Sequence, residues 1–138
     1  MINKLLKINF IYLSLFLFVL LITNQQNAKE ILIYADQITY DQKNNIIAKG
    51  KAKILYDNQI ILSNLIIYSQ TTGDVTLPIE FSLKDEKNNY YYGSNGNFES
   101  NFEFGNINDV KVLLEDGSRI VGTHIKREGP IDIITKGV

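Results

Sequence analysis

From Ile31 to Thr135 the apolar residues come in short runs rich in isoleucine and aromatic residues, and clusters of Asn, Asp and Gly separate these runs. No run keeps the 3.6-residue apolar period of an amphipathic helix for long. Short β-branched and aromatic segments between turn residues are typical of strands joined by hairpins. The pattern therefore predicts an all-β fold for this part of the chain.

Turn signals place the individual strands. Asp57-Asn58 and Asp116-Gly117 are two-residue hairpin signals. Pro78 has no amide hydrogen to donate to a sheet, so we expect its strand to lie at an edge or to carry a bulge. The Gly- and Asn-rich stretch 90–104 predicts irregular hairpins. The strands that we expect cover residues 31–34, 38–40, 46–56, 59–68, 75–83, 110–114, 119–126 and 131–135.

Residues 1–28 have the pattern of a secretory signal peptide. Two lysines precede an apolar run over 8–22, and a polar segment that ends in Ala28 comes after it. We therefore expect a signal helix that is cleaved after Ala28, and one mature domain over 29–138. Gln26 stands where signal peptidase prefers a small residue, so an uncleaved inner-membrane anchor is the alternative. The apolar run is short for that role, because a spanning helix needs about 20 apolar residues.

The sequence also aligns with itself after a shift of 28 residues, and each unit reads as strand, turn, strand. A weaker similarity after a shift of 59 residues aligns Ile61 with Ile120 and Ile66 with Ile125. A single β-hairpin of this size cannot bury its apolar face, so we expect stacked copies that form two facing sheets or one rolled sheet. The aligned pairs are Ile33 with Ile61, Ile38 with Ile66, Tyr40 with Tyr68, Asn45 with Gly73, Ile47 with Val75 and Leu55 with Leu83.

Composition excludes several classes of function. The chain of 138 residues has a net charge of −1, which does not provide the basic footprint of a nucleic-acid-binding protein. It has no cysteine and one histidine, so thiol chemistry, zinc–thiolate sites and His-rich metal sites are excluded. We expect no cofactor and no metal.

The sequence offers no convincing catalytic constellation. His124 has Glu115, Asp116 and Ser118 within ten residues, but a lone exposed histidine on a hairpin is the better interpretation. A loop with the oxygen ligands of a calcium site is also missing. We therefore expect that the protein is not an enzyme.

Five segments, taken in order, resemble the OstA-like repeat domain of the lipopolysaccharide-assembly family LptD. Residues 34–41 (YADQITYD) and 44–54 (NNIIAKGKAKI) look like one repeat, and residues 63–68 (SNLIIY) look like a second copy with Asn in place of Asp. Residues 114–120 (LEDGSRI) resemble the end of that domain, and residues 131–138 (IDIITKGV) resemble the segment after it, next to the start of a barrel. The order of the segments is more specific than any one of them.

This resemblance implies a β-jellyroll with open ends, whose interior shields the acyl chains of lipopolysaccharide in the periplasm. It also implies edge-strand pairing with other jellyroll transport proteins and a location beside the outer membrane. The full family member continues into an outer-membrane barrel and carries cysteines, whereas this chain has neither. We therefore expect either a stand-alone jellyroll beside a separately encoded barrel, or a split or truncated gene product. Two further hypotheses are an inner-membrane-anchored jellyroll and an envelope scaffold without a ligand.

For the lipid groove we choose apolar residues that alternate along the two repeats. The same residues could instead form a closed, dry core, since a groove and a core both need one apolar face. A small basic cluster of Lys111, Arg119, Lys126 and Arg127 could meet lipid phosphates, but a solvated face is favoured. The groove residues are Ile38, Tyr40, Ile47, Ile54, Ile61, Ile66, Tyr68, Phe81 and Leu83.

Overall fold

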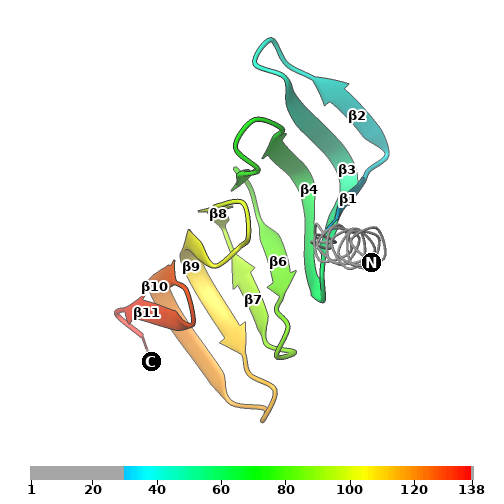
Figure 1. Ribbon diagram of the computed structural model, residues 1–138. Helices are drawn as coiled ribbons and strands as arrows, with labels where there is room; N and C mark the ends of the chain where they lie inside the picture. The colour runs from blue at the N-terminus through cyan, green and yellow to red at the C-terminus, as the bar shows by residue number, and fades with distance from the viewer. Residues whose placement is uncertain (1–29, 138) are drawn as a thin grey trace, which may run out of the picture.

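The structure is a computed structural model, and it describes residues 30–137. These residues form one antiparallel sheet of 11 strands. Figure 1 shows the strands side by side, from β1–β3 at the N-terminal end to β10 and β11 at the other. The predicted signal helix lies outside the described residues. Within 30–137 there is no helix of the length and apolarity needed to cross a membrane.

The strands match most of the predicted positions. Four of them are long, and the other seven have three to five residues each. The strands are β1 (Ile31–Tyr34), β2 (Gln37–Tyr40), β3 (Asn45–Tyr56), β4 (Gln59–Ser69), β5 (Val75–Leu77), β6 (Phe81–Lys84), β7 (Tyr90–Gly93), β8 (Asn95–Phe98), β9 (Phe104–Leu113), β10 (Arg119–Glu128) and β11 (Ile131–Thr135).

The long strands β3, β4, β9 and β10 each contribute to two layers. Their first-layer halves pair with β1, β6 and β7, giving the order β1-β3-β4-β6-β7-β9-β10. Their second-layer halves pair with β2, β5, β8 and β11, giving β2-β3-β4-β5-β8-β9-β10-β11. The long strands therefore run from one layer into the other, and the sheet folds back on itself along a line that crosses them. This is the arrangement of a jellyroll.

A crease between the two layers reverses which side chains point inward. Side chains alternate between the two faces of a strand, so buried residues on one face are separated by an even number of positions. In β4, however, the buried Ile61 and Ile66 are five positions apart, and in β9 Ile107 and Val110 are three apart. This reversal keeps the apolar side chains of both layers inside the fold.

Glycine and short polar residues form the crease. At Gly50 and Lys51, which have φ angles of 75° and 44°, β3 carries a bulge opposite Asn64. The Asp36 amide donates to the Gly50 carbonyl oxygen at 2.9 Å, and the Lys51 amide donates to Asn64 Oδ1 at 3.4 Å. Farther along the crease the Ser94 hydroxyl donates to Asp109 Oδ2 at 2.9 Å. The backbone groups at the bulge are thus hydrogen-bonded although the regular ladder is interrupted there.

One apolar core lies between the layers. Its buried residues come from both halves of the sheet, for example Ile54 and Leu83 from the first layer and Ile66 and Phe98 from the second. A continuous inward-facing row crosses the first layer from edge to edge. The row consists of Ile33, Ile54, Ile61, Leu83, Tyr91, Val112 and Ile120.

This row explains the sequence repeat. Ile33 and Ile61, which the 28-residue shift aligns, both pair with Ile54, and Ile120 closes the same row. The unit that recurs in the structure is a single strand crossing, which is half as long as the 28-residue repeat found in the sequence. One strand crosses the crease about every 14 or 15 residues, at positions 36, 50, 64, 79, 94, 109 and 123.

Two turns have nearly the same sequence and the same geometry. Residues 41–45 read DQKNN and residues 85–89 read DEKNN. In each turn the first aspartate accepts hydrogen bonds from the amides two and four residues later, at 2.8 and 2.9 Å. The fourth residue is an asparagine with a φ of 63° or 62°, the left-handed conformation that asparagine tolerates best after glycine. The motif therefore encodes a defined hairpin.

Two strand predictions need correction. The strand expected over 75–83 is two strands, because Pro78 lies where the chain passes the crease between β5 and β6. The stretch 90–104 is more regular than expected: it contains β7, β8 and the start of β9. Gly93 and Gly96 concealed these strands. A β-carbon at Gly93 would collide with Ile107 and Phe81, and one at Gly96 with the Asn106 carbonyl oxygen.

The bulge predicts a measurable difference between two glycines. Gly50→Ala should lower the free energy of unfolding by more than the roughly 1–2 kcal/mol expected for a left-handed alanine, because its β-carbon would lie 2.7 Å from Asp36 Oδ2. Gly117→Ala is the control, since Gly117 has a φ of 85° but an added β-carbon would meet no atom within 4 Å. Urea denaturation gives both values. Equal losses would show that the contact with Asp36 does not constrain the crease.

Candidate functional site

The space between the layers is the candidate site, and most of the predicted groove residues line it. Ile54, Ile61, Ile66 and Leu83 are fully buried there, and Phe81 is nearly so. They come from β3, β4 and β6, which lie side by side because β4 pairs with β3 on one side and with β6 on the other. The alternation in the sequence therefore identified side chains that share one interior.

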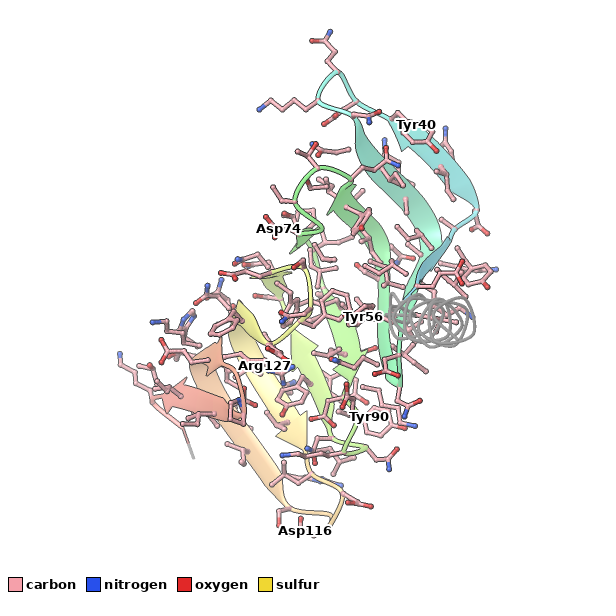
Figure 2. All side chains as sticks on the ribbon, in the orientation of Figure 1. Tyr40, Tyr56, Asp74, Tyr90, Asp116 and Arg127 are labelled. Atoms are coloured by element: carbon pink, nitrogen blue, oxygen red, sulfur yellow. The ribbon has the colours of Figure 1, made fainter. Side chains whose placement is uncertain are left out.

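Two predicted groove residues lie at the N-terminal end of the fold, and a third, Tyr68, is half-buried on β4. Ile38 and Tyr40 occupy inward-facing positions on β2, in the same rows as Ile66 and Tyr68. Among residues 30–137 no strand continues the sheet beyond β2, so Tyr40 remains 63% exposed and Ile38 44% exposed. Figure 2 shows Tyr40 at this end, remote from Arg127 among the C-terminal strands. These residues form an apolar rim at an open end of the interior.

Ile47 does not belong to the set. It lies between the inward-facing Ile46 and Ala48, so strand alternation directs it outward, where it pairs with Thr39 and Ile67. The 28-residue alignment placed it with Val75, but the turn at 69–74 is one residue longer than the turn at 41–45, so Val75 corresponds in the sheet to Ile46.

The interior is filled by side chains of the protein itself. Phe98 makes edge-to-face contacts with Phe81 and Phe102, at centroid distances of 6.1 and 6.0 Å. Phe102 in turn contacts Tyr56 at 5.2 Å, which links the loop after β8 to the end of the first-layer part of β3. Aromatic contacts therefore join the two layers.

A polar cluster also joins the layers, on the side away from the crease. The Tyr91 hydroxyl, from β7 in the first layer, donates to Asp132 Oδ2 in β11 at 2.8 Å. Arg127 of β10 donates to the same carboxylate, with Nε 3.0 Å from Oδ1 and Nη2 3.4 Å from Oδ2. The guanidinium lies 4.6 Å from the centre of the Tyr91 ring. We call Tyr91, Arg127 and Asp132 the interlayer cluster.

Burial controls the electrostatics of the interlayer cluster. Removal from water raises the pKa of Tyr91, and the hydrogen bond to Asp132 raises it further, so its hydroxyl remains a donor. Burial by itself would lower the pKa of Arg127, but the paired Asp132 outweighs this effect and the pKa is raised. The arginine is therefore a buried, permanently charged group whose partner is Asp132.

A cleft of about 340 Å³ opens beside the interlayer cluster. One wall carries Gln59 and the turn at residues 85–89, and the other carries Phe102, Glu103 and residues 129–132. These segments belong to the free ends of the two layers, opposite the crease. We call this edge of the fold, opposite the crease, the margin. Here the layers could separate without breaking the strand ladder.

Two further sequence predictions are resolved by the structure. His124 lies on the hairpin strand β10, as expected, but it is half-buried rather than exposed, with Nδ1 2.9 Å from Asn108 Oδ1. The expected basic cluster is dispersed, because Arg127 points inward while Lys126 points outward from the second layer. Among residues 30–137, no group of three or more His, Asp or Glu side chains could hold a metal ion.

The fold and its apolar interior define the class of a two-layered β-jellyroll, which confirms the fold predicted from the sequence. No family model matches the chain, and neither does any curated protein. Among solved structures it is similar to LptH, the LptA-homologous periplasmic component of the lipopolysaccharide transport device of Pseudomonas aeruginosa. The TM-score is 0.63 at 16% identity, over 77% of this chain and 82% of LptH. At this identity the likeness establishes the shared fold.

Sequence reasoning missed the interlayer cluster, although a signal was present. Arg127 follows the buried Ile125 by two positions, so strand alternation directs it inward. For Asp132 the pattern misleads, because alternation would direct the flanking Ile131 and Ile133 inward, whereas both are exposed. The sequence therefore signals the inward arginine but not its partner.

The interlayer cluster predicts a large cost for removing Asp132. Asp132→Ala leaves Arg127 buried without its counter-ion and should lower the free energy of unfolding by about 2–3 kcal/mol. Glu128→Ala removes the exposed ion pair between Lys126 and Glu128 and should cost less than about 1 kcal/mol. Urea denaturation of both variants measures the difference. Similar small losses would mean that the Arg127–Asp132 pair contributes no more than a surface pair.

Proposed function

We propose that this protein is a periplasmic carrier of lipopolysaccharide that shields acyl chains between the two layers of its jellyroll. The observation that carries the proposal is the continuous apolar interior, which has an exposed apolar rim at Ile38 and Tyr40. The fold shared with LptH, a lipopolysaccharide transport component, supports the same role. An acyl chain gains about 25 cal/mol for each Å² of apolar surface that it buries.

Loading requires the layers to move apart, because the interior is already packed. The crease is continuous backbone, whereas the opposite margin is joined only by side chains such as the interlayer cluster and the Tyr56–Phe102 contact. Opening at that margin would expose Ile54, Ile61 and Leu83 to a ligand and leave the strand pairing intact. The closed state would then protect the core when no lipid is bound.

Free strand edges support assembly with other jellyrolls. Among the described strands, β1 and β2 at one end each have a partner on one side only, and at the other end β11 has β10 alone. Unpaired backbone groups at such edges favour addition of a strand from another chain. In our proposal these edges connect the protein to similar jellyrolls in a transport bridge.

The position of the protein in the envelope depends on the proposed leader. Cleavage after Ala28 would release the domain 29–138 into the periplasm, where it would act beside the outer membrane, as the likeness to the LptD domain suggests. A separately encoded barrel would then complete the path. Retention of residues 8–22 would instead anchor the jellyroll in the inner membrane. Mass spectrometry of the mature N-terminus distinguishes the two arrangements.

The packed interior favours one other function. Ile54, Ile61 and Leu83 have no exposed surface in the closed fold, as expected for an envelope scaffold that binds no ligand. Both functions use the same fold, and they differ in whether the margin opens.

Photo-crosslinking in cells tests lipid binding. A photoreactive residue at Ile54 or Ile66 should form an adduct with lipopolysaccharide, because both positions face the interior. Probes at the exposed positions Lys43 and Thr76 should form none. Tyr91→Phe should raise the yield from Ile54 by removing the hydroxyl that joins the layers, whereas Tyr90→Phe, on the outward face, should not. Folded, exported protein that gives no adduct from either interior position would support the scaffold instead.

Strand-edge pairing is tested by placing a charge on β11. Ile133→Lys should reduce association between copies of the protein, measured by light scattering at increasing concentration, because charged side chains on edge strands oppose strand addition. Leu62→Lys is the matched control: Leu62 is 47% exposed and Ile133 48%, but Leu62 lies on the central strand β4. Equal effects of the two substitutions would argue against pairing through β11.

A further inference from the structure

The outward face of the first layer is unusually apolar for a solvent-exposed surface. Strand alternation directs one residue in two away from the core, and on this layer many of them are large and apolar. Contiguous exposed apolar surface on a soluble domain indicates an interaction site. The exposed members are Leu32, Tyr34, Leu62, Tyr90, Tyr92 and Val121.

All charges on the strands of this face are positive. Lys53, Lys84, Lys111 and Arg119 lie at outward positions, and the first-layer strand segments contain no Asp or Glu. The chain as a whole has a net charge of −1, so its carboxylates lie elsewhere, on the turns, along the crease and on the second layer. We call these four cations and the six apolar residues the basic face.

The cations of the basic face lie over its aromatic rings. The Lys53 ammonium is 4.9 Å from the centre of the Tyr34 ring, and the Lys84 ammonium is 5.8 Å from that of Tyr90. In this arrangement the lysine stem covers apolar surface while its charged end remains in water. Figure 2 shows Tyr90 near the turn end of the first layer.

The outward face of the second layer has a different chemistry. Its C-terminal half carries a set of amides, in which Asn108 Nδ2 donates to Asn95 Oδ1 at 2.6 Å and Asn108 Oδ1 meets His124. Its lysine at position 126 is paired with Glu128. The second layer also exposes Phe104, Ile131 and Ile133, but Glu128 lies beside Phe104 and is paired with Lys126. Exposed apolar residues with cations and without acidic strand residues are therefore a property of the first layer.

We propose that the basic face docks on the surface of an anionic phospholipid bilayer. Tyrosine side chains favour the boundary between headgroups and acyl chains, and cations near an anionic leaflet add electrostatic attraction. A nucleic acid would require a denser basic footprint with fewer apolar residues. The inference goes beyond lipid carriage between the layers, because it concerns an outer surface that remains free when the strand edges pair.

Vesicle flotation tests this docking. The full chain is expressed for export, and the protein recovered from the periplasmic extract is mixed with vesicles of phosphatidylethanolamine and phosphatidylglycerol. It should float with these vesicles and not with vesicles of phosphatidylcholine. The double variant Lys84→Gln/Lys111→Gln should lower the partition coefficient roughly 25-fold, about fivefold for each lost charge. Added salt should weaken binding by the wild type, because it screens exposed charges.

The control variant is Lys49→Gln/Lys126→Gln, which removes the same charge from the outward face of the second layer. It should bind vesicles as the wild type does, and circular dichroism checks that both variants are folded. Equal loss in the two variants would overturn the proposal, as would equal flotation with phosphatidylcholine. Retention on a polyanion column such as heparin, with no flotation on anionic vesicles, would assign the face to a macromolecular partner instead and would also overturn it.

Discussion

The reversal of side-chain direction at the crease is the constraint on which the rest of the fold depends. A long strand that continued with regular alternation would bury one layer and turn the apolar residues of the other toward water. The bulge at Gly50 and the irregular positions at Asn64, Ser94 and Asp109 prevent this in the strands that they interrupt. The core, the open margin and the two distinct outer faces all depend on where the reversal occurs.

Because the two layers are covalently continuous on one side only, the opposite side must be joined by side chains. Apolar contacts do most of this, through Phe102 and Tyr56, and the interlayer cluster adds directional bonds. Buried ion pairs rarely increase stability relative to apolar packing. In this fold the pair joins β10 to β11 within the second layer, and Asp132 also accepts the Tyr91 hydrogen bond that joins β11 to β7. Water could solvate these polar groups if the layers separated.

Much of the fold could be predicted from the sequence because its turns are explicit and its strands are rich in β-branched residues. The interior positions of Ile54, Ile61 and Leu83 also follow from alternation along three neighbouring strands. Ile47 was placed wrongly because the turn at 69–74 contains one residue more than the turn at 41–45, which shifts the alignment by one position after the turn. The interlayer cluster was missed because Tyr91 and Asp132 are 41 residues apart, and only the folded arrangement of layers brings them together.

The regular interval between crossings of the crease has a consequence for how this chain can change in length. Deleting one residue inside a strand would invert every side chain up to the next irregular position, whereas adding or losing a complete pair of strands would preserve the inward pattern on both sides. Natural variants of such a sheet should therefore differ in length by about two strand crossings at a time. Smaller insertions should be confined to the hairpin loops, where backbone geometry is most tolerant. Complete strands are thus added to such a sheet, or lost from it, only in pairs.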